Sequence, residues 1–208
     1  MEEVLDVYKR PFDPKRPLVC FDERPKQLIA EVRKPIPAQP GLLARYDYEY
    51  RRNGVANIFM MFEPLAGKRK VEITQRRTKR DFAECMRQLV DQIHPDADAI
   101  VLVMDNLNTH KKASLYEVFE PAEAKRIADK LEIHYTPKHG SWLNMAEIEI
   151  SVLSRQCLFD RTEDIERLER QVSAWQKRRD VAATTVDWRF TTPDARIKLK
   201  KLYPSLHK

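Results

Sequence analysis

Two aspartates in the sequence, Asp22 and Asp105, directly follow the apolar segments 18–21 and 101–104. Such segments are typical of buried strands, and a buried carboxylate costs free energy unless another group pairs with it. Ligand sites in open α/β sheets collect at the carboxyl ends of strands, so the two carboxylates could converge. With a third acid they would form the all-oxygen ligand set that Mg²⁺ or Mn²⁺ prefers. Each aspartate alone is also compatible with a turn or a helix N-cap.

The third acid is expected on a helix predicted over residues 142–157, which contains Glu147 and Glu149. Apolar residues at spacings of three and four form one buried stripe on this helix. At roughly 100° per residue, the two glutamates flank the stripe on opposite sides. Periodicity therefore leaves the choice between Glu147 and Glu149 open.

Two other chemistries are disfavoured by spacing. A zinc site would have to combine His110, His134, His139 and Cys157, whose spacings match no common zinc pattern. A phosphatase with Asp105 as its nucleophile usually has a second acid two residues later, and that position is Leu107.

The candidate ligands must be positioned by a particular order of strands and helices. Seven of the 13 prolines lie in the first 40 residues, which predicts a largely extended or looped segment around a short strand. The predicted elements, in order, are a strand at 18–23, an antiparallel hairpin of 55–65 and 68–76, a helix at 78–93, a strand at 99–104, a helical stretch at 113–130 broken at Pro121, a strand at 131–136, and helices at 142–157 and 163–178. This order predicts one mixed α/β sheet with helices on its faces.

The chain has 208 residues and a formal net charge of +6, and its basic residues are clustered. Residues 68–80 hold seven basic side chains against one acid, and residues 177–208 hold nine against three. Such clusters favour a polyanionic partner such as DNA, with a solvated basic face as the alternative. Apolar stretches fall short of the roughly 20 residues of a membrane span, and the N-terminus lacks a signal-peptide pattern. We therefore expect a cytoplasmic protein with no membrane partner, whose three cysteines are buried reduced thiols.

Two motifs together resemble the catalytic core of DDE-superfamily transposases, namely D-N-x-x-x-H at 105–110 and T-P-K-H-G-S-W-L-N-x-x-E at 136–147. The bacterial insertion-sequence branch of the Tc/mariner superfamily is the most similar. C-F-D-E at 20–23 and W-R-F-T-T-P-D-A-R-I-K-L at 188–199 also resemble this branch. The resemblance covers nearly the whole chain. It implies a ribonuclease H-like mixed sheet, with antiparallel first strands and then parallel strand–helix units, flanked by helices.

The resemblance also implies a metal-dependent DNA endonuclease and strand transferase that binds two Mg²⁺ or Mn²⁺ ions. Its catalytic and metal-binding triad maps onto Asp22, Asp105 and Glu147, so the resemblance favours Glu147 over Glu149. Such a site can nick DNA with water and then use the freed 3′-hydroxyl to attack a target strand. The implied assembly is a homodimer in a synaptic complex on the DNA of a bacterial nucleoid.

Transposases of this kind resemble two-part proteins, with N-terminal helix-turn-helix modules that recognise the transposon ends. This chain begins almost at the first catalytic strand, so we expect end recognition to be missing or supplied by a separate module. A catalytically silent remnant that only binds nucleic acid is the alternative. The expected organisation is an N-terminal extension (1–16), a catalytic domain (17–160), and a C-terminal helix and basic tail (161–208) packed on the same domain.

Further residues receive candidate roles from their types and positions. The polar side chains that could orient a ligand carboxylate or contact phosphate are Asn106, His110, His139 and Asn144. For Asn106 and the two histidines, the alternative is an ordinary polar loop residue. The basic side chains predicted to contact the DNA backbone, which give affinity rather than specificity, are Lys68, Arg69, Lys70, Arg76, Arg77, Lys79, Arg80, Lys177, Arg178 and Arg179.

Overall fold

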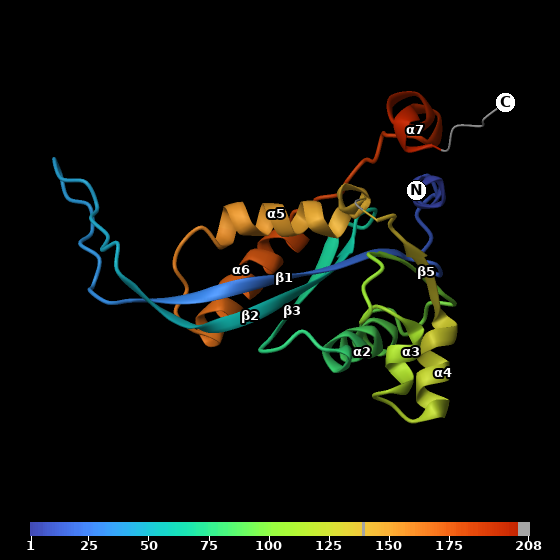
Figure 1. Ribbon diagram of the computed structural model, residues 1–208, viewed down its shortest axis with the longest axis horizontal. Coiled ribbons are helices and arrows are strands. Elements are labelled where there is room, and N and C mark those ends of the chain that lie inside the picture. The colour runs from blue at the N-terminus through green and yellow to red at the C-terminus, as the bar shows by residue number, and fades with distance from the viewer. Residues whose placement is uncertain (139, 204–208) are drawn as a thin grey trace.

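A computed structural model describes residues 1–138 and 140–203, which fold around one five-stranded sheet (Figure 1). The strands are β1 (Leu18–Glu31), β2 (Tyr50–Glu63), β3 (Lys68–Thr74), β4 (Ile100–Met104) and β5 (Leu131–Tyr135). Their order in the sheet is β3-β2-β1-β4-β5. The first three strands pair antiparallel, whereas β4 pairs parallel to β1 and β5 parallel to β4. The predicted mixed sheet is confirmed.

Helices cover both faces of the sheet and bury two hydrophobic cores. The first core lies under α5 (Met145–Cys157) and α6 (Ile165–Val181), and includes α1 (Glu2–Val7) and part of α7 (Thr192–Lys198). The second lies under α2 (Lys79–Gln88), the π-helical turn η1 (Leu89–Ile93), α3 (Lys112–Tyr116) and α4 (Pro121–Lys130). Because side chains alternate along a strand, Cys20 belongs to the first core and Phe21 to the second. No helix in the described ranges has the length and hydropathy that crossing a membrane requires.

Local sequence explains where several helices begin. Thr78 and Asp81 form a capping box at the start of α2, and Thr191 and Asp194 form another at α7. Pro121 occupies the first turn of α4, where its missing N–H is tolerated, which confirms the predicted break before this helix. The helix predicted from residue 142 begins three residues later, because Ser141–Leu143 forms a 3₁₀ turn, η2, before α5.

Both ends of the chain contain helices that the sequence did not predict. The first 40 residues are largely extended or looped as predicted, except that α1 forms at their start. The strand predicted at 18–23 is longer than expected and continues to Glu31. The basic tail contains α7 and the 3₁₀ turn η3 (Lys200–Leu202). The Thr192 hydroxyl donates to Asp6 at 2.8 Å, and Arg196 donates to Glu2 at 2.8 Å. These short helices are therefore stabilised by partners from the opposite end of the chain.

Residues 32–49 connect β1 to β2 as an arm that extends away from the sheet (Figure 1). Two isolated bridges, Ile36 to Arg45 and Gln39 to Leu42, hold its two sides together. The arm lies at the end of the sheet far from β5 (Figure 1).

Candidate active site

Asp22 and Asp105 lie at equivalent positions of two neighbouring parallel strands. Cys20 of β1 pairs with Val103 of β4, and each aspartate is two residues beyond this pair. Residues two apart on a strand point to the same face, so strand alternation directs both carboxylates to the face that α5 covers. Both aspartates are partly exposed. The two carboxylates therefore come together as predicted, although Asp22 lies within β1 and not at its end.

Glu147 reaches the same place from the first turn of α5. The side chain of Asn144, which caps this helix, accepts a hydrogen bond from the N–H of Ala146 at 3.1 Å. The amide of Asn144 also donates to the carbonyl of Phe21 at 2.8 Å, which fixes the start of α5 to β1 next to Asp22. One pocket of about 390 Å³ is lined by Asp22, Glu23, Arg24, Asp105, Ser141, Asn144, Glu147, Ile150 and Ser151.

Glu149 points elsewhere, into a buried cluster of ion pairs. Its carboxylate lies 2.9 Å from Nε of Arg69 on β3 and 2.9 Å from a guanidinium nitrogen of Arg179 on α6. Arg69 also pairs with Asp180 at 2.9 Å. Periodicity left Glu147 and Glu149 as equal candidates, and the structure brings only Glu147 to the pocket with the two aspartates.

The pocket concentrates negative charge. The pKa of Asp22 is raised to about 7, chiefly by burial and also by the negative charges of Glu23, Asp105 and Glu147, against a hydrogen bond from the Glu23 N–H that lowers it. An isolated aspartate would titrate near 3.8. An acid surrounded by acids in a partly closed pocket is a common arrangement at functional sites.

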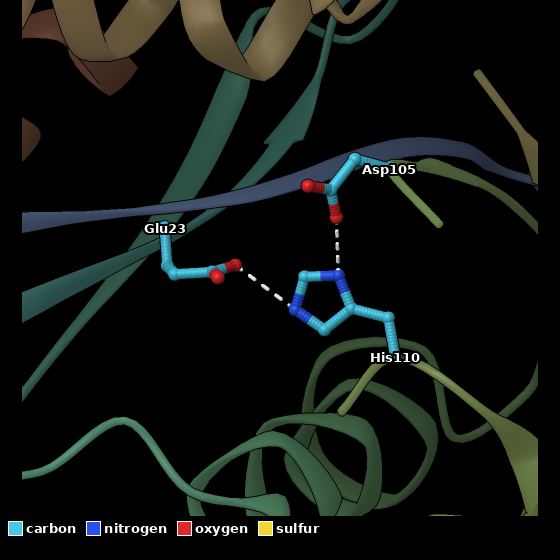
Figure 2. A group of neighbouring side chains, drawn as sticks. All are labelled: Glu23, Asp105 and His110. Carbon is cyan, nitrogen blue, oxygen red and sulfur yellow. Dashed lines mark hydrogen bonds and ion pairs between the residues drawn. The ribbon is translucent and has the colours of Figure 1, made fainter. Parts of the chain in front are cut away.

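His110 lies between two acids, one of which the sequence analysis left out (Figure 2). Its Nδ1 is 2.5 Å from Oδ1 of Asp105, and its Nε2 is 2.9 Å from Oε2 of Glu23. Burial alone lowers the pKa of His110, but the hydrogen bonds to Asp105 and Glu23 outweigh burial and raise the pKa to about 9. The sequence feature that could have identified Glu23 is strand alternation, which places its side chain on the face of β1 opposite to that of Asp22.

Glu23, Asp105 and His110 could in principle hold an ion themselves, because one ligand atom from each lies within 4.8 Å of the others. Both ring nitrogens of His110 already face carboxylate oxygens, however. An ion at this group would have to replace one of these contacts.

The other polar candidates near the triad have different surroundings. Asn144 is buried and makes the two hydrogen bonds that fix the start of α5, so it supports Glu147 through the helix. Asn106 is exposed directly after Asp105. His139 falls outside the described residues.

The predicted DNA-backbone residues divide by exposure. Arg69 was a wrong prediction, because its guanidinium is fully buried against Glu149 and Asp180 and cannot reach a phosphate. Arg179 is largely buried beside the same glutamate. The exposed members of the predicted set are Lys68, Arg76, Arg77, Arg80, Lys177 and Arg178. Lys70 and Lys79 are partly exposed, and each pairs with a nearby glutamate.

Comparisons with known proteins identify the family and the fold. A family model described as "DDE superfamily endonuclease" matches residues 17–169. Comparison with curated proteins gave no match. Among solved structures, the chain is similar to a chain of the Mos1 strand transfer complex, with 13% identity, a TM-score of 0.56, and coverage of 90% of this chain and 60% of that chain. It also resembles the Mos1 transposase paired-end complex with left transposon end, with 15% identity, a TM-score of 0.47, and coverage of 88% and 56%.

The likeness to the strand transfer complex shows a shared fold, and it confirms the predicted ribonuclease H-like architecture. The chain spans about 60% of the length of that Mos1 chain. The predicted resemblance to the DDE superfamily is confirmed by the family model, which covers well over half of the 208 residues. This chain belongs to the DDE superfamily endonucleases.

Proposed function

We propose that this chain is the catalytic domain of a metal-dependent DNA endonuclease and strand transferase that acts in DNA transposition and integration. The observation that carries the proposal is that Asp22, Asp105 and Glu147 come from three separate elements and line one pocket. Membership of the DDE endonucleases supports the assignment of these three residues as the catalytic and metal-binding triad.

The family implies a divalent metal ion, and the pocket residues fit one. Their donor atoms are carboxylate oxygens, which Mg²⁺ and Mn²⁺ prefer. A cation held between them would relieve the repulsion that contributes to the raised pKa of Asp22. In this proposal, Asp22, Asp105 and Glu147 would hold two Mg²⁺ or Mn²⁺ ions, and the chemistry that such ions would supply is activation of the attacking oxygen and stabilisation of the leaving oxygen at phosphorus.

The chain itself positions the three carboxylates. Asp22 lies within β1 and Asp105 directly follows β4, so both depend on the central strands of the sheet. Glu147 depends on α5, whose start is fixed to β1 by Asn144. Since the pKa of Asp22 is about 7, this carboxyl would release its proton as the site takes up a cation near neutral pH.

DNA is the partner that the surface charge favours. The exposed Arg76, Arg77 and Arg80 lie on the loop and helix start that follow β3, and Arg77 is 3.4 Å from Glu23 beside the pocket. Their positive charge can bind phosphates and bring a strand to the carboxylates. The fold shared with a strand transfer complex supports transposition over simple nuclease activity. We extend the proposal to a homodimer on DNA, with end recognition by a separate module.

The proposed organisation is a catalytic domain at 17–160, an N-terminal extension at 1–16 and a C-terminal segment at 161–208 on the same domain. The ion pairs of Arg69 with Asp180 and of Glu2 with Arg196 support this packing. We place the protein on the nucleoid, in the cytoplasm of a bacterial cell.

Nicking of supercoiled plasmid by the purified chain tests the proposal, with Mg²⁺ or Mn²⁺ present or chelated. We expect metal-dependent nicking that Asp105→Ala abolishes while DNA binding, measured by gel shift, is retained. Nicking that survives Asp105→Ala would overturn the proposed triad. DNA binding by the wild-type chain with no nicking in either metal would instead identify a silent remnant.

A further inference from the structure

The imidazole of His110 connects Asp105 to Glu23, a second acid that lines the pocket. It lies 2.5 Å from Oδ1 of Asp105 on one side and 2.9 Å from Oε2 of Glu23 on the other. The side chains of His110 and Glu23 are each 1% exposed, whereas that of Asp105 is 33% exposed. Figure 2 shows the second oxygen of Asp105 pointing away from the ring. One oxygen of Asp105 is therefore fixed on the protein side, and the other is left for the pocket.

The ring itself is held from several directions. It packs edge-on against Phe21 at 5.3 Å between ring centroids and lies tilted against Phe82 at 5.1 Å. The hydroxyl of Tyr135 donates to the backbone carbonyl of His110 at 2.8 Å. A ring confined in this way can impose its orientation on a neighbouring carboxylate.

Asp105 needs such support because it lies just beyond the end of its strand. The pairing of β4 with β5 ends at Met104 and Tyr135, and that of β4 with β1 ends at Val103. Strand pairing thus stops before the residue whose carboxylate must be fixed. The side-chain contact with His110 therefore fixes Asp105 at a position where hydrogen bonds between strands do not.

We propose that His110, oriented by Glu23, is a positioning residue that fixes the Asp105 carboxylate. This inference rests on the proposed function, and its consequence is that His110 sets the affinity of the pocket for a divalent cation. Groups that hydrogen-bond to metal-binding side chains typically change metal affinity or activity by about 10–100-fold when they are mutated. Glu23 acts through His110 and is predicted to have a smaller effect.

Two substitutions of His110 separate positioning from simple stability. The side-chain nitrogen of asparagine is as many bonds from Cα as Nδ1 of histidine, so His110→Asn keeps a donor for Asp105 and loses the contact with Glu23. The nitrogen of glutamine matches Nε2, so His110→Gln keeps the contact with Glu23 and loses that with Asp105. His110→Asn leaves the buried Glu23 carboxylate with only the longer Arg77 contact at 3.4 Å, whereas the Asp105 carboxylate that His110→Gln releases is 33% exposed. Because a buried carboxylate that loses a partner costs more than a partly exposed one, His110→Asn should be the less stable of the two.

The test is Mn²⁺ binding to the full chain, followed by electron paramagnetic resonance of free Mn²⁺, beside thermal denaturation of each variant. We expect His110→Gln to bind Mn²⁺ about 10–100-fold more weakly than wild type, and His110→Asn to stay within about threefold. Glu23→Gln should fall between them. The order of Mn²⁺ affinity is then the reverse of the order of stability, which a purely structural role would not produce.

Wild-type affinity in His110→Gln, or affinities that follow the melting temperatures, would overturn the positioning role while leaving the proposed function intact if the wild type nicks DNA. Loss of one bound Mn²⁺ in Glu23→Gln, with the remaining affinity unchanged, would overturn it in favour of an ion held by Glu23, Asp105 and His110. A wild-type chain that neither binds Mn²⁺ nor nicks DNA would overturn the proposed function and this inference together.

Discussion

Nε of Arg69 lies 2.9 Å from Oε1 of Glu149, and the two side chains are 0% and 3% exposed. This buried pair joins β3 to α5, and Arg179 and Asp180 extend it to α6. It explains why Glu149 is absent from the pocket, and it makes the orientation of α5 depend on an ion-pair cluster on the far side of the helix.

Removing one partner of this pair should destabilise the fold strongly. Glu149→Met leaves the buried guanidinium of Arg69 short of a partner, and a cost of about 3–5 kcal/mol is expected from urea unfolding. The double variant Arg69→Met/Glu149→Met should lose less than the sum of the two single losses, because no unpaired charge remains between them. Additive losses would show that the two side chains do not act as a pair.

Asn144 should matter to both stability and metal binding. Asn144→Ala removes the N-cap of α5 and the tie to Phe21, with an expected loss of about 1–2 kcal/mol. The matched control is Asp164→Ala, which removes the N-cap of α6, where Asp164 accepts from the N–H of Arg167 at 2.6 Å. Both variants should have a lower melting temperature than wild type, but only Asn144→Ala should weaken Mn²⁺ binding in a calorimetric titration. If the two variants bind Mn²⁺ with equal affinity, Asn144 does not position Glu147.

The pairing of the two chain ends predicts a pH dependence of stability. Hydrogen bonds from Arg196 lower the pKa of Glu2 from 4.5 to about 2. A carboxyl with a lowered folded-state pKa stabilises the fold above its unfolded pKa, and this contribution is lost as the pH falls toward the folded value. The melting temperature of Glu2→Gln should therefore be below that of wild type at pH 7, and the gap should narrow below pH 4.5. The effect should be small because the pair is exposed, and a gap that widens at low pH would contradict it.

The exposed arginines that follow β3 should contribute to DNA binding through salt-dependent contacts. Arg80→Ala should reduce the slope of log Kobs against log[salt] by about 1 and weaken binding similarly for different DNA sequences. Lys125→Ala is the control, because Lys125 is exposed on α4 and pairs with Asp129 on its own helix. Fluorescence anisotropy at several salt concentrations measures both slopes. An unchanged slope for Arg80→Ala would remove this residue from the DNA-binding surface.

The two strands that carry Asp22 and Asp105 could be predicted because the signals are local. An apolar run followed by an acid correctly marked the end of β4 before Asp105, but it was wrong for Asp22, because β1 continues to Glu31. The parallel pairing of β1 with β4 nevertheless brings the two aspartates together. The choice of Glu147 over Glu149 was not accessible to periodicity, since it depends on Arg69, which lies 80 positions earlier in the chain on β3.

Other features depended on contacts that no local pattern reveals. The helix α1 has only six residues and depends on Thr192 and Arg196 at the other end of the chain. Arg69 was predicted to face DNA because it lies in a basic run, and only the fold shows that it is buried beside Glu149 and Asp180. The contacts of His110 depend on the path of the loop after β4, for which the sequence provides no template.

The central claim, that Glu147 completes a metal-dependent DNA-cleaving site with Asp22 and Asp105, is tested most directly by the rate of Mg²⁺-dependent nicking in Glu147→Gln and Glu149→Gln. The two variants change the same chemical group two residues apart on one helix, and only Glu147 lines the pocket. Below the melting temperature of both, Glu147→Gln should nick DNA roughly 10²–10³-fold more slowly than wild type, whereas Glu149→Gln should keep a rate near wild type. A Glu147→Gln chain that nicks at the wild-type rate would contradict the account.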